Sequence, residues 1–269
     1  MTAHIGARAA ALRRRLSERD IAVLASLNRV RLLTSQQVQR LHIYESSPAS
    51  RPRRTRSILK RLHDLQLVVR LSRTIGGIRA GSSGHVYGLS GLGQAVLDVQ
   101  GLYEKRRRRI WETKPHFQDH VLAVAEIFVR LVESTRSSSA ELLAFDAEPA
   151  CWRSYTGSGG EPVTVKPDAF VRTGIGDIER SAFLEVDLAT EGPGTINRKC
   201  QAFVAYWRNG LEQQRHGLFP SVLWLVPSEQ RRERLQLTIR QLARDAHQLF
   251  AVAVFADAVS ILTEPEGGA

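Results

Sequence analysis

Cysteine and long apolar runs are scarce in this sequence of 269 residues. The two cysteines, Cys151 and Cys200, lie far apart and lack the spacing of metal ligands, which indicates a reducing compartment. The longest apolar run, 249–262, contains Asp257 and is too short to span a bilayer, so it predicts strands. Residues 1–15 lack the apolar core of a signal peptide. These absences favour a cytoplasmic protein with no membrane partner.

Several catalytic motifs are missing as well. The sequence has no Gly-x-x-x-x-Gly-Lys-Ser/Thr loop, so a nucleotide cofactor is not expected. It has no Gly-x-Ser-x-Gly elbow, which argues against a serine hydrolase. It also lacks a His-x-His pair, which one common class of relaxase needs beside a tyrosine nucleophile.

Acidic residues are sparse in the first part of the chain. Residues 1–115 contain 23 Lys and Arg against 7 Asp and Glu, a net charge of +16. Residues 116–269 contain 15 Lys and Arg against 20 Asp and Glu, a net charge of −5. A length of this order suits two domains. The asymmetry indicates a polyanionic partner for the first part, double-stranded DNA above all, with a merely solvated surface as the alternative.

The basic part has the element order of a winged helix-turn-helix domain. Ser17 is placed to cap the first helix, with Asp20 at the third position of that helix. The predicted elements are helices over 17–30, 35–42 and about 54–66, strands over 68–73 and 85–90, and a helix that begins near Ser90. Residues 76–84, rich in Gly and Ser, join the two strands as a wing. In such domains one helix enters the major groove of DNA.

The candidate DNA-binding residues lie on the third of these helices and in the wing. Apolar residues form one face of the helix, and basic residues form the other. The candidates are Arg53, Arg54, Arg56, Lys60 and Arg61 on the helix, and Arg73 and Arg79 in the wing. The alternative is a winged helix that contacts another protein.

The second part predicts an α/β domain with a mixed sheet. Its expected elements are a helix over 117–134, strands near 142–145, 165–172 and 181–188, a helix over 195–208, a strand over 221–227, a helix over 230–248 and a strand over 250–255. The continuously apolar segment 221–227 is typical of a strand covered on both faces. The fold class is therefore α/β in two domains. The limits are a basic tail over 1–16, the winged helix over 17–103, a basic linker over 104–115, the second domain over 116–263 and a tail over 264–269.

Three acidic residues in neighbouring strands suggest a metal site. Asp168 lies in one predicted strand, and Glu185 and Asp187, two positions apart in the next, point to one face. If the strands pair as a hairpin, their oxygens can converge on Mg²⁺ or Mn²⁺ and support phosphodiester hydrolysis. Lys199, in the following helix, is the candidate cationic catalytic residue. The alternative is a set of sheet-edge acids that bind no metal.

Two further carboxylates are possible members of the same site. Glu126, in the helix over 117–134, could add a ligand or lie at the surface. Glu191 could bind metal or merely precede a loop.

The acidic segment resembles the PD-(D/E)xK nuclease superfamily. The resemblance rests on Pro167-Asp168 followed by Glu185-Val186-Asp187. Asp187 occupies the position of the motif lysine, and Lys199 is placed like the displaced lysine of some members. The resemblance implies a restriction-endonuclease-like fold for the second domain.

Residues 17–260 resemble the replication-relaxation family of plasmid and mobile-element proteins. The segments that carry this resemblance, beside the basic winged helix, are His116–His120, Phe183–Glu191, Lys199 and Tyr206. That family is similar to the C-class mobilisation relaxases. The resemblance implies metal-dependent nicking of plasmid DNA at an origin, with other DNA-transfer or replication proteins as candidate partners.

Three functions follow as hypotheses. In the first, the winged helix recognises DNA and the second domain nicks it with a metal held by the acids. In the second, the protein is a non-catalytic replication accessory or transcriptional regulator with a degenerate nuclease fold. In the third, it is a protein-interaction adaptor that binds little DNA.

Overall fold

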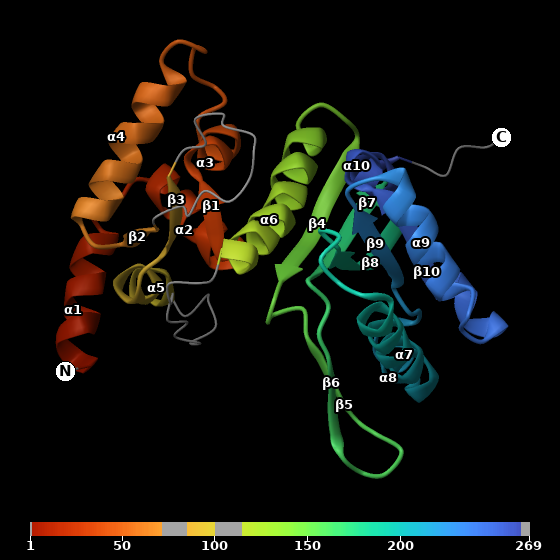
Figure 1. Ribbon diagram of the computed structural model, residues 1–269. Coiled ribbons are helices and arrows are strands. Elements are labelled where there is room, and N and C mark those ends of the chain that lie inside the picture. Colours follow the sequence, from red (N-terminus) through yellow and green to blue (C-terminus); the bar gives the residue numbers. More distant parts are fainter. Residues whose placement is uncertain (1, 72–84, 100–114, 265–269) are drawn as a thin grey trace. The chain divides into compact units, whose positions relative to one another are not determined.

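The computed structural model describes residues 2–71, 85–99 and 115–264 (Figure 1). The chain forms two compact units, Met1–Val129 and Arg130–Ala269. The division falls inside helix α6 (Pro115–Thr135), which the sequence analysis assigned almost whole to the second domain.

Parts of the predicted domain plan lie outside the described residues. The wing segment 76–84, with Arg73 and Arg79 beside and within it, is one of them. The linker 104–115 is described only at Pro115, and the tail 264–269 only at Glu264. The functions predicted for these segments therefore stay predictions.

The first unit packs helices around a small antiparallel sheet. Its helices before α6 are α1 (Thr2–Arg13), α2 (Glu18–Val30), α3 (Ser35–His42), α4 (Arg51–Asp64) and α5 (Gly91–Asp98). Its strands are β1 (Leu32–Thr34), β2 (Val68–Leu71) and β3 (Val86–Leu89), in the order β1-β3-β2. Both strand pairs are antiparallel. The helices and strands predicted between residues 17 and 98 are thus all present.

Two helix starts are fixed by reciprocal capping. Ser17 accepts a hydrogen bond from the Asp20 backbone, and the Asp20 carboxylate accepts one from the Ser17 backbone. Thr34 and Gln37 make the same exchange at α3. Each exchange satisfies backbone N–H groups that the first helical turn leaves without a partner. The predicted cap at Ser17 is confirmed.

The first unit also contains two elements that the sequence analysis did not predict. The predicted basic tail over 1–16 is helical from Thr2 to Arg13, with Ala9 and Leu12 buried and α1 packed against α5. The apolar residues of α1 form no continuous stripe, so periodicity gave no helix signal there. Strand β1 is only three residues long, too short for an alternating pattern to reveal it.

The second unit is built on a mixed five-stranded sheet. Its strands are β4 (Ala140–Ala147), β7 (Ala169–Ile175), β8 (Ile178–Val186), β9 (Ser221–Val226) and β10 (Phe250–Val254). The spatial order is β10-β9-β8-β7-β4. Strand β8 pairs antiparallel with β7 and parallel with β9. The predicted mixed sheet is therefore confirmed, and β7 and β8 form the hairpin that the metal-site hypothesis assumed.

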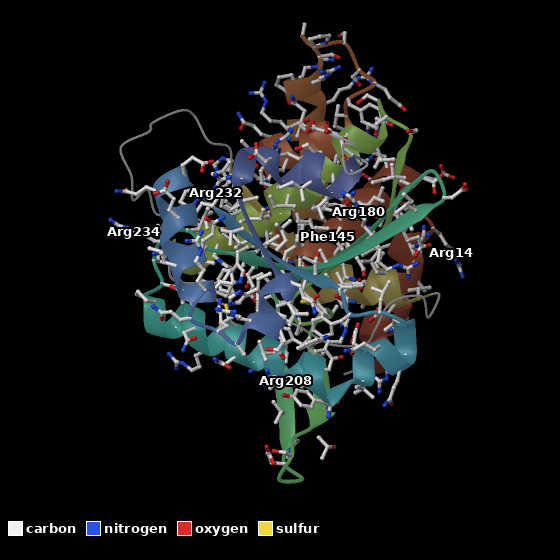
Figure 2. All side chains as sticks on the ribbon, turned by 90° about the vertical axis from the view of Figure 1, so that its right-hand side faces the viewer. Arg14, Phe145, Arg180, Arg208, Arg232 and Arg234 are labelled. Carbon is white, nitrogen blue, oxygen red and sulfur yellow. The ribbon has the colours of Figure 1, made fainter. Side chains whose placement is uncertain are left out.

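Helices cover this sheet and a hairpin extends from it. The remaining elements are α7 (Pro193–Asn209), α8 (Leu211–His216), α9 (Glu229–Ile239), α10 (Ala258–Thr263), the 3-10 turns Arg244–Leu249 and Phe255–Asp257, and the hairpin of β5 (Arg153–Thr156) and β6 (Pro162–Val165). Phe183 and Trp224 of the sheet form one core with Phe203 of α7 and Leu235 of α9. Helices α7 and α9 consequently lie on one face of the sheet. Figure 2 shows Phe145 of β4 in the interior and Arg234 of α9 at the outside.

Three predicted elements of the second unit have different limits. The strand expected over 165–172 is divided, because β6 ends at Val165 and β7 begins at Ala169. Pro167 between them has no N–H to donate to a strand ladder. The helix expected over 230–248 ends at Ile239, and the run 249–262 holds one strand followed by helical turns.

Candidate functional site

Asp168 lies just before β7, one residue outside the strand in which it was predicted. Its backbone N–H donates to the Leu184 carbonyl of β8 at 3.0 Å. Its carboxylate Oδ2 accepts a hydrogen bond from the Val186 backbone at 2.7 Å. These two bonds hold the buried Asp168 side chain against the end of β8.

Glu185 and Lys199 form a nearly buried ion pair. Glu185 is 1% exposed, and its Oε2 accepts a hydrogen bond from Lys199 Nζ at 3.0 Å. Burial raises the pKa of the Glu185 carboxyl well above its usual range; the Asp168 charge raises it further, and Lys199 opposes both. Burial lowers the pKa of the Lys199 ammonium, but the charges of Glu185 and Asp168 outweigh that effect and leave this pKa raised. Lys199 is therefore a cation at neutral pH.

Glu191 joins this pair from the loop after β8. Its Oε1 lies 2.9 Å from Lys199 Nζ. Its other carboxylate oxygen, Oε2, is buried and has no hydrogen-bond partner among the described residues. Asp168, Glu185, Lys199 and Glu191 therefore interact electrostatically at one place, and we call these four residues the acid–lysine cluster.

Asp187 is held elsewhere, by a different cation. It follows the last residue of β8 and is 1% exposed. Its Oδ2 accepts a hydrogen bond from Arg231 Nε of α9 at 2.5 Å, and its Oδ1 accepts one from the Ala189 backbone at 2.8 Å. Arg231 also donates to the Glu191 carbonyl at 2.6 Å. Asp187 thus shapes the loop that carries Glu191, and the structure does not join it to Asp168 and Glu185.

The carboxylates have the chemistry of a divalent-metal site but not its arrangement. Carboxylate oxygens suit Mg²⁺ and Mn²⁺, and the partnerless Glu191 Oε2 could accept a further contact. Among the residues that the structure describes, however, no three His, Cys, Asp or Glu side chains are placed to hold one ion. Lys199 already forms ion pairs with Glu185 and Glu191, and Arg231 forms one with Asp187. As they lie, these side chains do not fit a bound metal.

Glu126, which was a possible further carboxylate of the site, lies outside the cluster. Glu126 belongs to the first unit, where its Oε1 accepts from Arg40 at 2.7 Å and its Oε2 accepts from Gln37 at 3.0 Å. Those bonds tie α6 to α3.

Cys200 is buried beside Lys199, and burial with the nearby Glu185 charge raises its pKa to about 12. A thiol with such a pKa stays protonated at neutral pH and is a poor nucleophile.

The basic residues of α4 form two rows: an outer row, and a second row whose arginines contact other residues of the first unit. Arg53, Arg56 and Lys60 are exposed and follow the three- and four-residue spacing of one helix face. Lys60 pairs with Asp64 one turn on, at 2.6 Å. On the neighbouring face, Arg54 donates to Ser46 at 3.1 Å and Arg61 pairs with the fully buried Asp20. The outer row is thus the part of α4 best placed to meet a polyanion.

Two residues near the cluster were not singled out from the sequence. Arg231 contacts Asp187 across 44 residues of chain, and no local pattern indicates that pairing. Trp224 is the register partner of Glu185 in β9, and Lys199 Nζ lies 5.6 Å from the centre of its ring. The apolar segment 221–227 indicated a buried strand but not which side chain would underlie Lys199.

Residues 24–222 match the family model described as replication-relaxation. The match covers well over half of the chain and includes α3, α4 and the acid–lysine cluster, so this chain belongs to the replication-relaxation family. Membership indicates a replication-related role in plasmids or other mobile elements, and it implies interaction with DNA. No curated protein and no solved structure matches the chain. Within the described ranges, no helix combines the length and apolarity needed to cross a membrane.

Proposed function

We propose that the chain binds duplex DNA at a plasmid or mobile-element origin through a winged helix in its first unit. The order α2-β1-α3-α4-β2-β3 and the antiparallel β1-β3-β2 sheet support this assignment. The observation that carries the proposal is the outer row of Arg53, Arg56 and Lys60 on α4, opposite the buried Leu59 and Leu62. Exposed arginines in such a row can contact successive phosphates or base edges.

Fluorescence anisotropy with a labelled duplex of mixed sequence tests this proposal on the full chain. We expect the double variant Arg53→Gln/Arg56→Gln to bind at least about tenfold more weakly than the wild type at low salt, because two phosphate contacts are lost. The matched control is Arg234→Gln/Arg240→Gln, which removes two exposed arginines from or beside α9 of the second unit.

If both double variants weakened DNA binding equally, the effect would come from net charge alone, and α4 would be rejected as the DNA-contacting helix. An absence of salt-dependent DNA binding in the wild type would favour the adaptor hypothesis instead.

A second candidate function is metal-dependent nicking of DNA by the second unit. It is favoured by the acid–lysine cluster, because Asp168, Glu185 and Lys199 carry the resemblance to PD-(D/E)xK nucleases and interact with one another. Along the chain, β4, β7, β8, α7 and β9 follow the order that the sequence predicts for the α/β domain. In such a site the Lys199 ammonium could hold a phosphate oxygen while the carboxylates accept protons.

A nicking assay on supercoiled plasmid with Mg²⁺ or Mn²⁺ tests this candidate. We expect Glu185→Gln to abolish the conversion to open circles, because it removes a charge from the cluster and keeps its shape. The control is Glu179→Gln in the same strand, where the carboxylate is exposed and pairs with Arg172. Nicking that persists in Glu185→Gln would remove the catalytic assignment, and a wild type that binds DNA without nicking would favour a non-catalytic replication accessory or regulator.

A further inference from the structure

The turn between α1 and α2, residues 14–17, carries two exposed arginines. Arg14 and Arg15 follow the last residue of α1 directly. Neither guanidinium forms an ion pair with a residue that the structure describes. The surrounding segment 13–19 contains four arginines and one glutamate. We call residues 14–17 the α1–α2 turn; it is a positively charged surface of the first unit.

Hydrogen bonds and an ion pair hold this turn beside the C-terminal half of α4. Ser17, at the end of the turn, donates to Asp20 Oδ2 at 2.7 Å, and the other oxygen of Asp20 pairs with Arg61 of α4. Arg8 of α1 donates to Gln66, which lies just after α4, at 2.9 Å. Figure 1 accordingly shows α1 next to the C-terminal end of α4 within the first unit.

The turn supplies positive charge at the end of α4 where the cations of α4 are neutralised. Lys60 and Arg61 are both paired with carboxylates. Phosphates recur about every 3.4 Å along each strand of a duplex, so DNA held on the outer row of α4 also presents phosphates beyond the end of that helix. Arg14 and Arg15 are exposed cations at this end.

We propose that the α1–α2 turn is a second DNA contact, in which Arg14 and Arg15 bind backbone phosphates beside the stretch of duplex that α4 contacts. The proposal rests on the proposed DNA binding by α4 and extends it to another element. The family match begins at residue 24, so this contact lies in a part of the chain outside the match. A phosphate contact positions the protein on DNA without reading its sequence.

The salt dependence of DNA affinity tests this contact on the full chain. Fluorescence anisotropy with a labelled duplex of mixed sequence is repeated over a range of salt concentrations. We expect Arg14→Gln/Arg15→Gln to bind at least about tenfold more weakly than the wild type at low salt. The slope of log affinity against log salt should fall by about two, because each lost phosphate contact removes about 0.9 from it. The loss should be the same on AT-rich and GC-rich duplexes.

Two controls separate a contact from a change of net charge or of fold. Arg234→Gln/Arg240→Gln removes the same charge from the second unit and should leave the slope at the wild-type value. Circular dichroism establishes that each variant is folded. If Arg14→Gln/Arg15→Gln unfolds, the two single variants replace it, and each should lower the slope by about one.

The outcomes distinguish this contact from the one made by α4. A wild-type slope in the folded Arg14→Gln/Arg15→Gln variant, with a reduced slope in Arg53→Gln/Arg56→Gln, overturns the second contact and keeps DNA binding by α4. The reverse result keeps the α1–α2 turn as a contact and rejects α4.

Two further results reject both contacts. One is an equal loss of slope in the variant of the second unit, because net charge alone would then explain the effect. The other is a wild type that shows no salt-dependent DNA binding.

Discussion

Lys199 and Arg61 are both cations that neutralise a carboxylate buried in the fold. Lys199 pairs with Glu185, which is 1% exposed, and Arg61 pairs with Asp20, which is fully buried. A buried carboxylate that loses its cation keeps its desolvation cost without compensation. Substitution of either cation is therefore expected to change stability as well as function, and the two effects need separate measurements.

For Lys199→Met, we expect a loss of unfolding free energy of about 3 kcal/mol near pH 8. The raised pKa of Glu185 gives this loss a pH dependence, because the carboxyl takes up a proton as the pH falls through that pKa. A neutral Glu185 no longer needs Lys199, so the difference from the wild type should shrink as the pH is lowered through that pKa. Urea unfolding over a series of pH values from about 8 downwards measures it, and a loss that is equal at every pH would contradict the ion-pair account.

For α4, we expect Arg61→Met to affect mainly stability and Arg53→Met to affect mainly DNA binding. Arg61→Met should lower the unfolding free energy by about 1–2 kcal/mol, since Asp20 loses its charged donor. Arg53→Met should change stability by less than about 0.5 kcal/mol, because Arg53 is exposed, and should weaken DNA binding. Thermal unfolding and anisotropy on the same samples compare them; a stable Arg61→Met would show that Asp20 needs no guanidinium.

At the scale of elements, β1 and α3 share a residue. Thr34 ends β1, where it is the register partner of Val86 in β3, and its side chain caps α3. We expect Thr34→Ala to lower the unfolding free energy by about 1 kcal/mol through loss of the cap. The exposed Ser57→Ala within α4 is the control and should leave stability unchanged or slightly higher. A Thr34→Ala variant as stable as the wild type would contradict the capping role.

Local signals in the sequence predicted most of the helices and strands, but contacts between residues far apart in the chain were not predicted. Ser17 with Asp20 lies within one helical turn, so its cap was readable. The pairing of β7 with β8 is also local, because only Gly176 and Asp177 separate the two strands. The bond between Asp187 and Arg231 spans 44 residues, and only the β8-α7-β9-α9 path brings its partners together. The sequence therefore placed Asp168, Glu185 and Lys199 near one another but could not assign Asp187 to α9.

For the whole molecule, the division of charge between the two parts of the sequence has a measurable consequence. Residues 1–115 carry a net charge of +16 and residues 116–269 carry −5. DNA affinity should therefore fall linearly with salt on logarithmic axes, with a slope set by the phosphates that the basic part neutralises. We expect Arg53→Gln/Arg56→Gln to reduce that slope by about two. An unchanged slope would show that these arginines touch no phosphate.

The Asp168 carboxylate accepts a hydrogen bond from the backbone of Val186, the last residue of β8, and so stabilises the end of that strand. Asp168→Ala would remove the acidic group and would also leave the Val186 amide at the end of β8 without its hydrogen-bond acceptor. The lost hydrogen bond should lower the unfolding free energy by about 1–3 kcal/mol. Asp168→Asn keeps an oxygen for that amide and removes only the negative charge. Deuterium uptake at Val186 should accelerate in Asp168→Ala and stay near wild type in Asp168→Asn, which makes asparagine the substitution that separates electrostatics from fraying of the sheet.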